Sequence, residues 1–277
     1  MNDIGIMQGR LSPPTNGKFQ SFPKYTWRDE FHKSRECDLT IIEWIFEADE
    51  WEKNPISSDD GIHEIQDLSA QTGIRVVSVC ADYFMDLPLL RVDAQTAAQR
   101  IDKLLWLMDQ SKKLGVHYIN IPFVDRSAIT TPGELTQVAD YMRSCAEQAR
   151  SLDILLCLET SLNPEQFKNL LGQIDHPFIC ANYDIGNSAS LGYRSDEEFY
   201  AYGLKIKTLH IKDRVLHGGT VPLGEGNADF DMTFEQLRQH HFAGPIIFQS
   251  ARGQDGDEVR TIKSYIHQMQ SYLKLLE

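Results

Sequence analysis

The segment DILLCLET at 153–160 decides the fold together with two similar runs that follow it, FICANYDI at 178–185 and IKTLHIKD at 206–213. Each run is short, rich in aliphatic residues and more continuously apolar than alternating. This pattern is typical of strands that are buried on both faces of a parallel sheet. Each run also ends in charged or polar residues. We therefore expect a parallel sheet that carries polar groups at the carboxyl ends of its strands.

Similar apolar runs continue outward in both directions along the chain. They lie near Ile4 (DIGIM) and at 39–45, 74–81, 116–124 and 245–252. Eight such runs alternate with about eight segments of helical periodicity. This alternation predicts the α/β class and a (β/α)8 TIM barrel that forms one domain over 1–277. An open doubly wound sheet is the alternative, but no glycine-rich dinucleotide motif follows the first strand.

Start and stop signals support the helical segments. Gly115 follows the periodic segment 93–115 as a stop signal, and Pro132 stands in the first turn of 131–152. Ser195 is the expected N-cap of the helix at 195–203.

Composition and charge exclude several classes of partner. The 277 residues include 27 Lys and Arg against 40 Asp and Glu, so the formal charge is −13. An acidic chain is a poor partner for nucleic-acid phosphates and for anionic membrane surfaces. The apolar runs also fall far short of the roughly 20 residues that span a bilayer. We expect neither a nucleic-acid nor a membrane partner.

The cysteines and the N-terminal residues indicate the cellular compartment. Five cysteines are scattered without a Cys-x-x-Cys pair, and the first residues lack the basic region and apolar run of a signal peptide. We therefore expect reduced thiols and a cytoplasmic protein.

The barrel predicts where the functional groups lie, because active sites in this fold sit at the carboxyl ends of the strands. The polar residues at those ends are Gln8 and Arg10, Glu43, Cys80 and Asp82, Asp125, Glu159, Asp184 and Asn187, His210, Lys212 and Asp213, and Gln249 and Arg252. We expect them to form a polar ring at the barrel mouth.

Glu159, Asp184 and His210 end the fifth, sixth and seventh strands, so they should face one another. Two carboxylates and an imidazole suit a divalent ion, and Gln249 could add a fourth oxygen ligand. We expect Mn²⁺, with Mg²⁺, Co²⁺ and Zn²⁺ as other ions that such ligands accept. The alternative is a hydrogen-bonded polar cluster that closes the barrel without a metal.

The motifs at these strand ends resemble those of the xylose isomerase-like barrel superfamily. The motifs are LET at 158–160, YDIGNS at 183–188, LHIKDR at 209–214 and LGEGNADF at 223–230. They look most like the branch of sugar and sugar-phosphate isomerases and epimerases. The resemblance implies a metal held by Glu, Asp, His and Glu at strands five to eight, with the two glutamates acting as acid and base on opposite faces of the sugar.

The sequence departs from this pattern at two positions. Glu159, Asp184 and His210 match the family ligands, but the eighth-strand position is Gln249. Glutamine can ligate a metal through its carbonyl oxygen, yet it cannot transfer a proton at neutral pH. Asn187 stands where the family often has a histidine, three residues after the sixth-strand aspartate.

The resemblance implies an enzyme: a divalent-metal-dependent isomerase or epimerase of a small sugar, ketose or polyol derivative, with proton transfer next to a metal-polarised carbonyl. Gln249 removes one of the two acids that epimerisation uses. Isomerisation needs only one mobile base, so this change affects it less than it affects epimerisation. Two alternatives remain open: a non-catalytic sugar- or metabolite-binding barrel that lost its second catalytic acid, and a dehydratase or lyase on the same scaffold.

Roles for individual residues follow from these expectations. Glu159 is the candidate base, and Lys212, Asp213 or Cys80 is its candidate partner, with Lys212 preferred as the second catalytic residue. The expected substrate-binding residues are Gln8, Arg10, Glu43, Cys80, Asn187, Asp213 and Arg252. The expected ligand is a small sugar or polyol. Homodimers and homotetramers are common among the relatives, and the sequence leaves the oligomeric state open.

Overall fold

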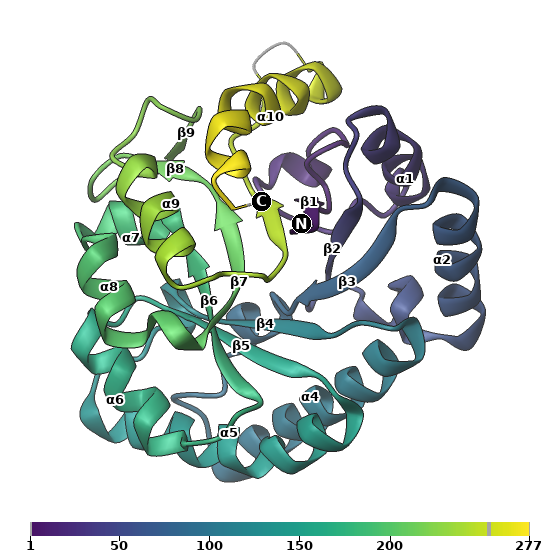
Figure 1. Cartoon of the computed structure of the whole chain (residues 1–277). Coiled ribbons are helices and arrows are strands. Elements are labelled where there is room, and N and C mark those ends of the chain that lie inside the picture. The colour runs from purple at the N-terminus through teal and green to yellow at the C-terminus, as the bar shows by residue number, and fades with distance from the viewer. Residues whose placement is uncertain (1, 254–255, 277) are drawn as a thin grey trace.

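The computed structural model describes residues 2–253 and 256–276. Its centre is a closed barrel of parallel strands in the order β1-β10-β7-β6-β5-β4-β3-β2 (Figure 1). The barrel strands are β1 (Ile4–Met7), β2 (Ile41–Ile45), β3 (Arg75–Cys80), β4 (Tyr118–Phe123), β5 (Leu155–Thr160), β6 (Ile179–Asp184), β7 (Ile206–Ile211) and β10 (Ile246–Phe248). Each of the eight predicted segments contains one of these strands, so the barrel prediction is confirmed.

Helices surround the barrel and connect its strands (Figure 1). They are α1 (Trp27–Glu36), α2 (Asp59–Thr72), α3 (Tyr83–Asp86), α4 (Ala94–Leu114), α5 (Pro132–Leu152), α6 (Pro164–Ile174), α7 (Ile185–Leu191), α8 (Ser195–Tyr202), α9 (Phe230–Gln239) and α10 (Glu258–Lys274). A short antiparallel pair, β8 (Asp213–Arg214) and β9 (Thr220–Val221), follows β7. Single 3-10 turns lie at Thr15–Gly17, Trp51–Lys53, Pro55–Ser57, Asp125–Ser127 and Gly203–Lys205.

Local capping explains most helix boundaries. The helix α4 ends at Gly115, whose φ of +82° suits a glycine, and α5 begins with a reciprocal capping box between Thr131 and Glu134. The predicted N-cap of α8 is wrong: Ser195 is the first helical residue, and its buried hydroxyl has no hydrogen-bond partner among the described residues. Acidic residues at 196–198 occupy the first turn of α8, where negative charge stabilises the helix dipole.

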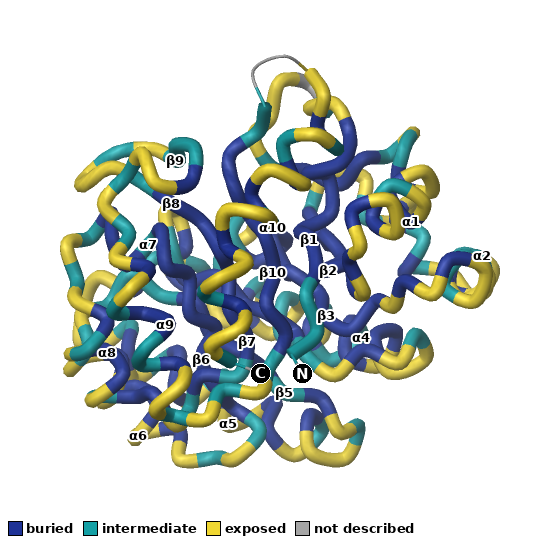
Figure 2. The backbone as a smooth tube through the Cα atoms, turned by 45° about the horizontal axis from the view of Figure 1, so that its top comes forward, coloured by how far each residue is buried: buried dark blue, intermediate teal, exposed yellow. Residues whose placement is uncertain are grey.

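The barrel strands are buried on both faces, as their apolar sequences predict. Figure 2 shows the strands largely buried, whereas the surrounding helices expose their outer faces. Close packing also determines a residue at the start of the barrel. A Cβ added to Gly5 would lie 2.5 Å from the carbonyl oxygen of Ile41, so only glycine lets β1 approach β2 this closely. The result is a rigid frame for the strand ends.

The cysteines agree with the expectation of reduced thiols, because all five are buried and free. Among the described residues, no helix is both long enough and apolar enough to cross a membrane.

A buried carboxylate fixes the segment that carries two of the site residues. Glu198 of α8 accepts hydrogen bonds from Tyr183 Oη, Ser188 Oγ and Tyr202 Oη, each at 2.8 Å. Burial raises the pKa of Glu198, although the three hydroxyl donors act in the opposite direction. The cluster ties the end of β6 and the start of α7 to α8, and so it holds the backbone around residues 183–188.

We expect Glu198→Ala to lower the free energy of unfolding by about 3 kcal/mol, because it leaves buried hydroxyl groups without their acceptor. Urea unfolding followed by circular dichroism measures the change. The neighbouring Glu197 is exposed, so Glu197→Ala should cost less than about 0.5 kcal/mol. Equal effects of the two substitutions would show that the Glu198 cluster does not stabilise the fold.

Candidate active site and metal centre

Three predicted ligands meet at the carboxyl end of the barrel. Glu159 ends β5, Asp184 ends β6, and His210 lies in β7, directly opposite Asp184 in the sheet register. One ligand atom from each residue lies within 4.8 Å of the other two, and all three residues are buried. The Nδ1 atom of His210 lies 3.5 Å from Glu159 Oε2 and 4.0 Å from Asp184 Oδ2.

The other ring nitrogen of His210, Nε2, is paired with Glu43. The distance from His210 Nε2 to Glu43 Oε1 is 2.8 Å, and both side chains are completely buried. Glu43 also accepts a hydrogen bond of 2.6 Å from Asn120 Nδ2. The structure therefore places Glu43 beneath the cluster and outside the cavity described below. There it orients the imidazole so that Nδ1 faces the two carboxylates, as the outer partners of metal-ligating histidines do.

Strong electrostatic coupling links these groups. Burial alone would lower the pKa of His210, but the charge of Glu43 and hydrogen bonds with Glu159 and Glu43 raise it to about 10. Burial alone would raise the pKa of Glu159, yet the hydrogen bond and charge of His210 hold it below its usual value. Asn182 also donates to Glu159 Oε2 at 2.7 Å. The donor set of one imidazole and two carboxylates, backed by a third carboxylate, fits a divalent cation.

Lys212 and Gln249 complete this part of the site. Lys212 Nζ donates to Asp184 Oδ2 at 3.1 Å and to Gln249 Oε1 at 3.2 Å. The Gln249 amide nitrogen in turn donates to Gln20 Oε1 at 2.8 Å. The carbonyl oxygen of Gln249 thus faces the lysine ammonium, and an ion held by Gln249 would share that oxygen with Lys212. The role of Gln249 as a fourth ligand stays a prediction.

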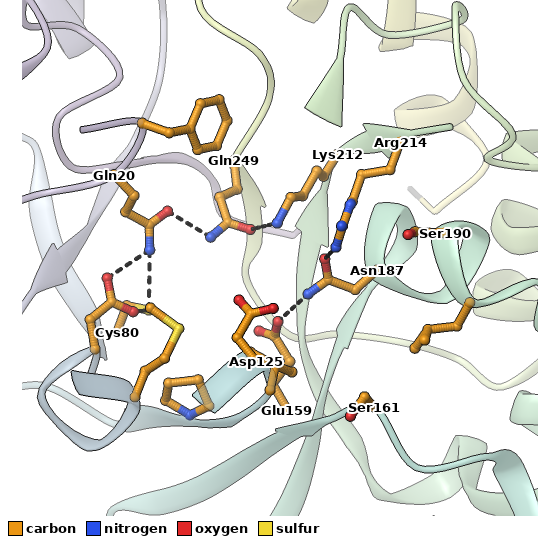
Figure 3. Close-up of a pocket in the computed structure, with 16 residues that line it drawn as sticks. Gln20, Cys80, Asp125, Glu159, Ser161, Asn187, Ser190, Lys212, Arg214 and Gln249 are labelled. Carbon is orange, nitrogen blue, oxygen red and sulfur yellow. Dashed lines mark hydrogen bonds between the residues drawn. The ribbon is translucent and has the colours of Figure 1, made fainter. Parts of the chain in front are cut away.

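Glu159, Lys212 and Gln249 line a cavity of about 260 Å³ (Figure 3), whereas Asp184 and His210 lie outside its lining. Such a volume lies at the small end of the range for small-molecule sites. Five of the predicted site residues line it: Cys80, Glu159, Asn187, Lys212 and Gln249. Other polar lining residues are Gln20, Asp82, Asp125, Ser161, Ser190 and Arg214.

Asn187 connects the two carboxylates of the cluster. Its side-chain amide donates to Glu159 Oε1, and its backbone N–H donates to Asp184 Oδ1 at 2.8 Å. Asp184 thereby caps the N-terminus of α7. Arg214 Nη1 donates to Asn187 Oδ1 at 2.8 Å, which fixes the orientation of the amide. Asn187 therefore lines the cavity and also positions the carboxylate of Glu159.

Arg10 and Arg252, two predicted substrate-binding residues, lie behind the cavity wall. Both donate to the backbone carbonyl of Phe19, at 2.9 and 3.2 Å. They hold the segment that places Phe19 and Gln20 against the cavity. Gln8 also lies outside the cavity, where its Oε1 atom accepts the backbone N–H of Ile45 at 3.0 Å.

Three further lining residues shape the site without being among the predicted site residues. Asp82 belongs to the predicted polar ring at the end of β3, and Arg214 is the last residue of the LHIKDR motif at 209–214, so strand-end position indicates both. Gln20 lies in the long connection after β1, and no local pattern signals that its side chain reaches the cavity.

Comparisons with known proteins agree with this geometry. Residues 31–270 match the family described as the xylose isomerase-like TIM barrel. An L-ribulose-5-phosphate 3-epimerase, UlaE, from Shigella flexneri is 25% identical over 186 residues, which cover 65% of this chain and 66% of that relative. This chain thus spans just under two thirds of that relative's length.

Solved structures share the same fold. A structure of L-ribulose 3-epimerase superposes with a TM-score of 0.78 at 17% identity, covering 100% of this chain and 96% of that chain. A structure of the IolI protein with a bound zinc atom superposes with a TM-score of 0.77 at 15% identity, covering 98% and 99%. The chain belongs to the xylose isomerase-like TIM barrel family.

Asp213, another predicted substrate-binding residue, holds the loop that follows β9. Its carboxylate accepts backbone N–H groups of Gly224, Gly226 and Ala228 at 2.9, 2.9 and 3.0 Å. A Cβ at Gly226 would collide with this carboxylate, so the close approach requires glycine. The structure thus ties Asp213 to the loop and keeps it out of the cavity lining.

We expect Asp213→Ala to release this loop, because it removes three charge-assisted hydrogen bonds. Amide hydrogen exchange at Gly224, Gly226 and Ala228 should accelerate by about tenfold or more, since one lost bond of this kind is worth about 1.5 kcal/mol. Glu225→Ala in the same loop changes an exposed side chain and serves as the control. Unchanged protection in Asp213→Ala would contradict the anchoring role.

Proposed function

We propose that the chain is a divalent-metal-dependent isomerase or epimerase, which moves a proton at the carbon next to the carbonyl of a small sugar, ketose or polyol derivative. The cluster of Glu159, Asp184 and His210, of which Glu159 lines the small cavity, carries this proposal. We expect Mn²⁺ at the cluster, with Mg²⁺, Co²⁺ or Zn²⁺ as ions that the same nitrogen and oxygen donors accept. The free, buried thiols and the acidic charge favour a cytoplasmic enzyme.

The side chains of the cluster have different roles in the proposed reaction. When bound, a divalent ion supplies Lewis-acid polarisation of the substrate carbonyl and the adjacent hydroxyl. Glu159, Asp184 and His210 would hold the ion, and Glu43 keeps His210 in position. Glu159 is the base: it is oriented by Asn182 and Asn187, and its lowered pKa keeps it ionised and ready to accept a proton.

Lys212 contributes a positive charge at the same edge of the cavity. An ammonium group carries three N–H donors, and the contacts with Asp184 and Gln249 use two of them. The third can donate to the substrate oxygen on which negative charge develops when the proton leaves. We therefore assign Lys212 a role in stabilising that charge.

The cavity favours an uncharged sugar over a phosphorylated one. The two cationic side chains among its lining residues are both engaged, Lys212 by Asp184 and Gln249, and Arg214 by Asn187 and the carbonyl of Gly218. Arg10 and Arg252, which could have bound a phosphate, donate to backbone carbonyls behind the wall. The curated relatives act on a sugar phosphate, so this difference separates the chain from them.

The metal site is tested by the metal content of untagged protein purified without added metal. We expect about one divalent ion per chain by mass spectrometry, and a stabilisation of about 2.7 kcal/mol when Mn²⁺ is added at a hundred times its Kd. Glu159→Gln and His210→Ala should lose both effects. Asp125→Asn changes another carboxylate of the same cavity and should keep them. Metal-free wild-type protein that no such ion stabilises would contradict the proposal.

The reaction is tested by incubating the metal-loaded protein in D₂O with L-ribulose, D-psicose, D-tagatose and L-ribulose 5-phosphate. We expect deuterium to enter the carbon next to the carbonyl of at least one neutral ketose. The kcat/KM should exceed that for the sugar phosphate by about tenfold or more, since each 1.4 kcal/mol of lost charge pairing is a factor of ten. Glu159→Gln should abolish the exchange. Tight binding without exchange would identify a non-catalytic sugar-binding barrel instead.

A further inference from the structure

Inversion of configuration next to a carbonyl needs two proton-transfer groups, because a proton leaves one face of the carbon and another arrives on the opposite face. Glu159 supplies one such group, and Gln249 cannot supply the second. The remaining titratable side chains among the described lining residues are Cys80, Asp82, Asp125, Lys212 and Arg214.

Most of these candidates are poorly suited to the second transfer. Arg214 is held by Asn187 and the carbonyl of Gly218, and Lys212 is paired with Asp184. Burial raises the pKa of the Cys80 thiol well above its usual value, so the thiolate is scarce. Asp125 is exposed, and its carboxylate has no hydrogen-bond partner among the described residues that would hold it in place. Asp82 remains.

The carboxylate of Asp82 is buried and held at the cavity. Asp82 precedes the short helix α3, yet its side chain makes no capping hydrogen bond there. Its Oδ2 atom instead accepts from Gln20 Nε2 at 2.8 Å, and its Oδ1 atom accepts from Cys80 Sγ at 3.2 Å. Only 6% of the residue is exposed to solvent. The carboxylate is thus not needed to start α3 and is oriented by two side chains of the cavity wall.

Two hydrogen bonds connect Asp82 through Gln20 to the eighth-strand position. Figure 3 shows the bond between Gln20 and Gln249. Gln20 donates to Asp82 through its amide nitrogen and accepts from Gln249 through its amide oxygen. Asp82 therefore lies one side-chain amide away from Gln249. Glu159 reaches the same cavity from a different strand, β5, and is held by a separate set of partners, Asn182 and Asn187.

The surroundings of Asp82 support proton transfer near neutral pH. Burial raises the pKa of Asp82 to about 6, against the two hydrogen-bond donors that lower it. The negative charges of Glu159 and Asp86 act in the same direction as burial, and the buried guanidinium of Arg10 also faces this carboxylate. A carboxyl group in this range can both give and take a proton at neutral pH.

We propose that Asp82 is the second proton-transfer residue of this enzyme, so that the chain is a two-base epimerase in which Asp82 replaces the acid missing at Gln249. This inference rests on the proposed function and specifies its reaction. It restores the inversion that the loss of the eighth-strand acid had made unfavourable.

The proposed reaction balances without a further reactant. Glu159 takes the hydrogen as a proton, the C–H electron pair forms a C=C bond, and the carbonyl π pair moves to its oxygen. The C=O bond then re-forms, and the C=C electron pair takes a proton from the Asp82 carboxyl on the opposite face of the carbon. Glu159 is left protonated and Asp82 ionised, and exchange with water restores both. Substrate and product differ only in configuration.

The test is Asp82→Asn, which keeps the shape of the side chain and an oxygen acceptor for Gln20. Wild type and variant are compared in D₂O with a neutral ketose, and NMR follows inversion and deuterium incorporation separately. We expect inversion to fall by about a hundredfold or more, the usual contribution of a proton-transfer residue. Exchange of the hydrogen that faces Glu159 should continue in one epimer, because Glu159 is intact.

Two further variants make the result specific. Asp82→Asn combined with Gln249→Glu should recover inversion about tenfold or more, because it returns a carboxyl group to the neighbouring position. Asp102→Asn changes an exposed aspartate of α4 that does not line the cavity, and it should leave both rates unchanged. Thermal unfolding of each variant checks that the fold is intact.

The outcomes separate this inference from the proposed function. Inversion that persists in Asp82→Asn, or a wild type that exchanges deuterium without inverting its substrate, overturns the role of Asp82 and leaves the proposed function in place. A folded Asp82→Asn variant that loses both inversion and exchange, and is not rescued by Gln249→Glu, would show that Asp82 only positions other groups. That result also overturns the proton-transfer role of Asp82. A wild type that neither exchanges nor inverts overturns the proposed function, and this inference falls with it.

Discussion

The contact of 2.8 Å between His210 Nε2 and Glu43 Oε1 is the interaction on which the candidate site depends. It joins β7 to β2 through the barrel interior, where both side chains are inaccessible to solvent. A buried carboxylate without a partner would be costly, and so would an imidazole that was free to rotate. Because Glu43 takes one ring nitrogen, the other must face Glu159 and Asp184. The orientation of His210 toward Glu159 and Asp184 is therefore a consequence of the pairing between His210 and Glu43 inside the barrel.

A second constraint is the exchange of a carboxylate for an amide at Gln249. An amide has a donor and an acceptor on the same side chain, so it can continue a row of hydrogen bonds in one direction. Gln249 accepts from Lys212 and donates to Gln20, which in turn donates to Asp82. A glutamate at this position could not donate to Gln20. Glutamine at this position is uncharged and donates to Gln20, which in turn holds the buried carboxylate of Asp82 after β3.

The walls of the cavity are held by residues that do not enter it. Arg10 and Arg252 bind the Phe19 carbonyl on one side, and Asp213 binds the loop amides at 224–228 on the other. Charged side chains at strand ends are therefore not all substrate contacts. Several of them satisfy backbone groups of long connections, which would otherwise lack hydrogen-bond partners. This anchoring explains how a site formed partly by loops can keep a defined shape.

The sequence by itself determined the barrel and the three ligands of the cluster. Continuous apolar runs specify strands buried on both faces, and parallel strands bring their carboxyl ends together, so Glu159, Asp184 and His210 had to meet. Only the tertiary structure decided which polar side chains enter the cavity. Gln20 reaches it from a long connection without a local signal, whereas Arg10 and Asp213 turn away to bind backbone groups. The direction of a side chain at a strand end depends on which distant donors and acceptors need a partner, and that information is not local.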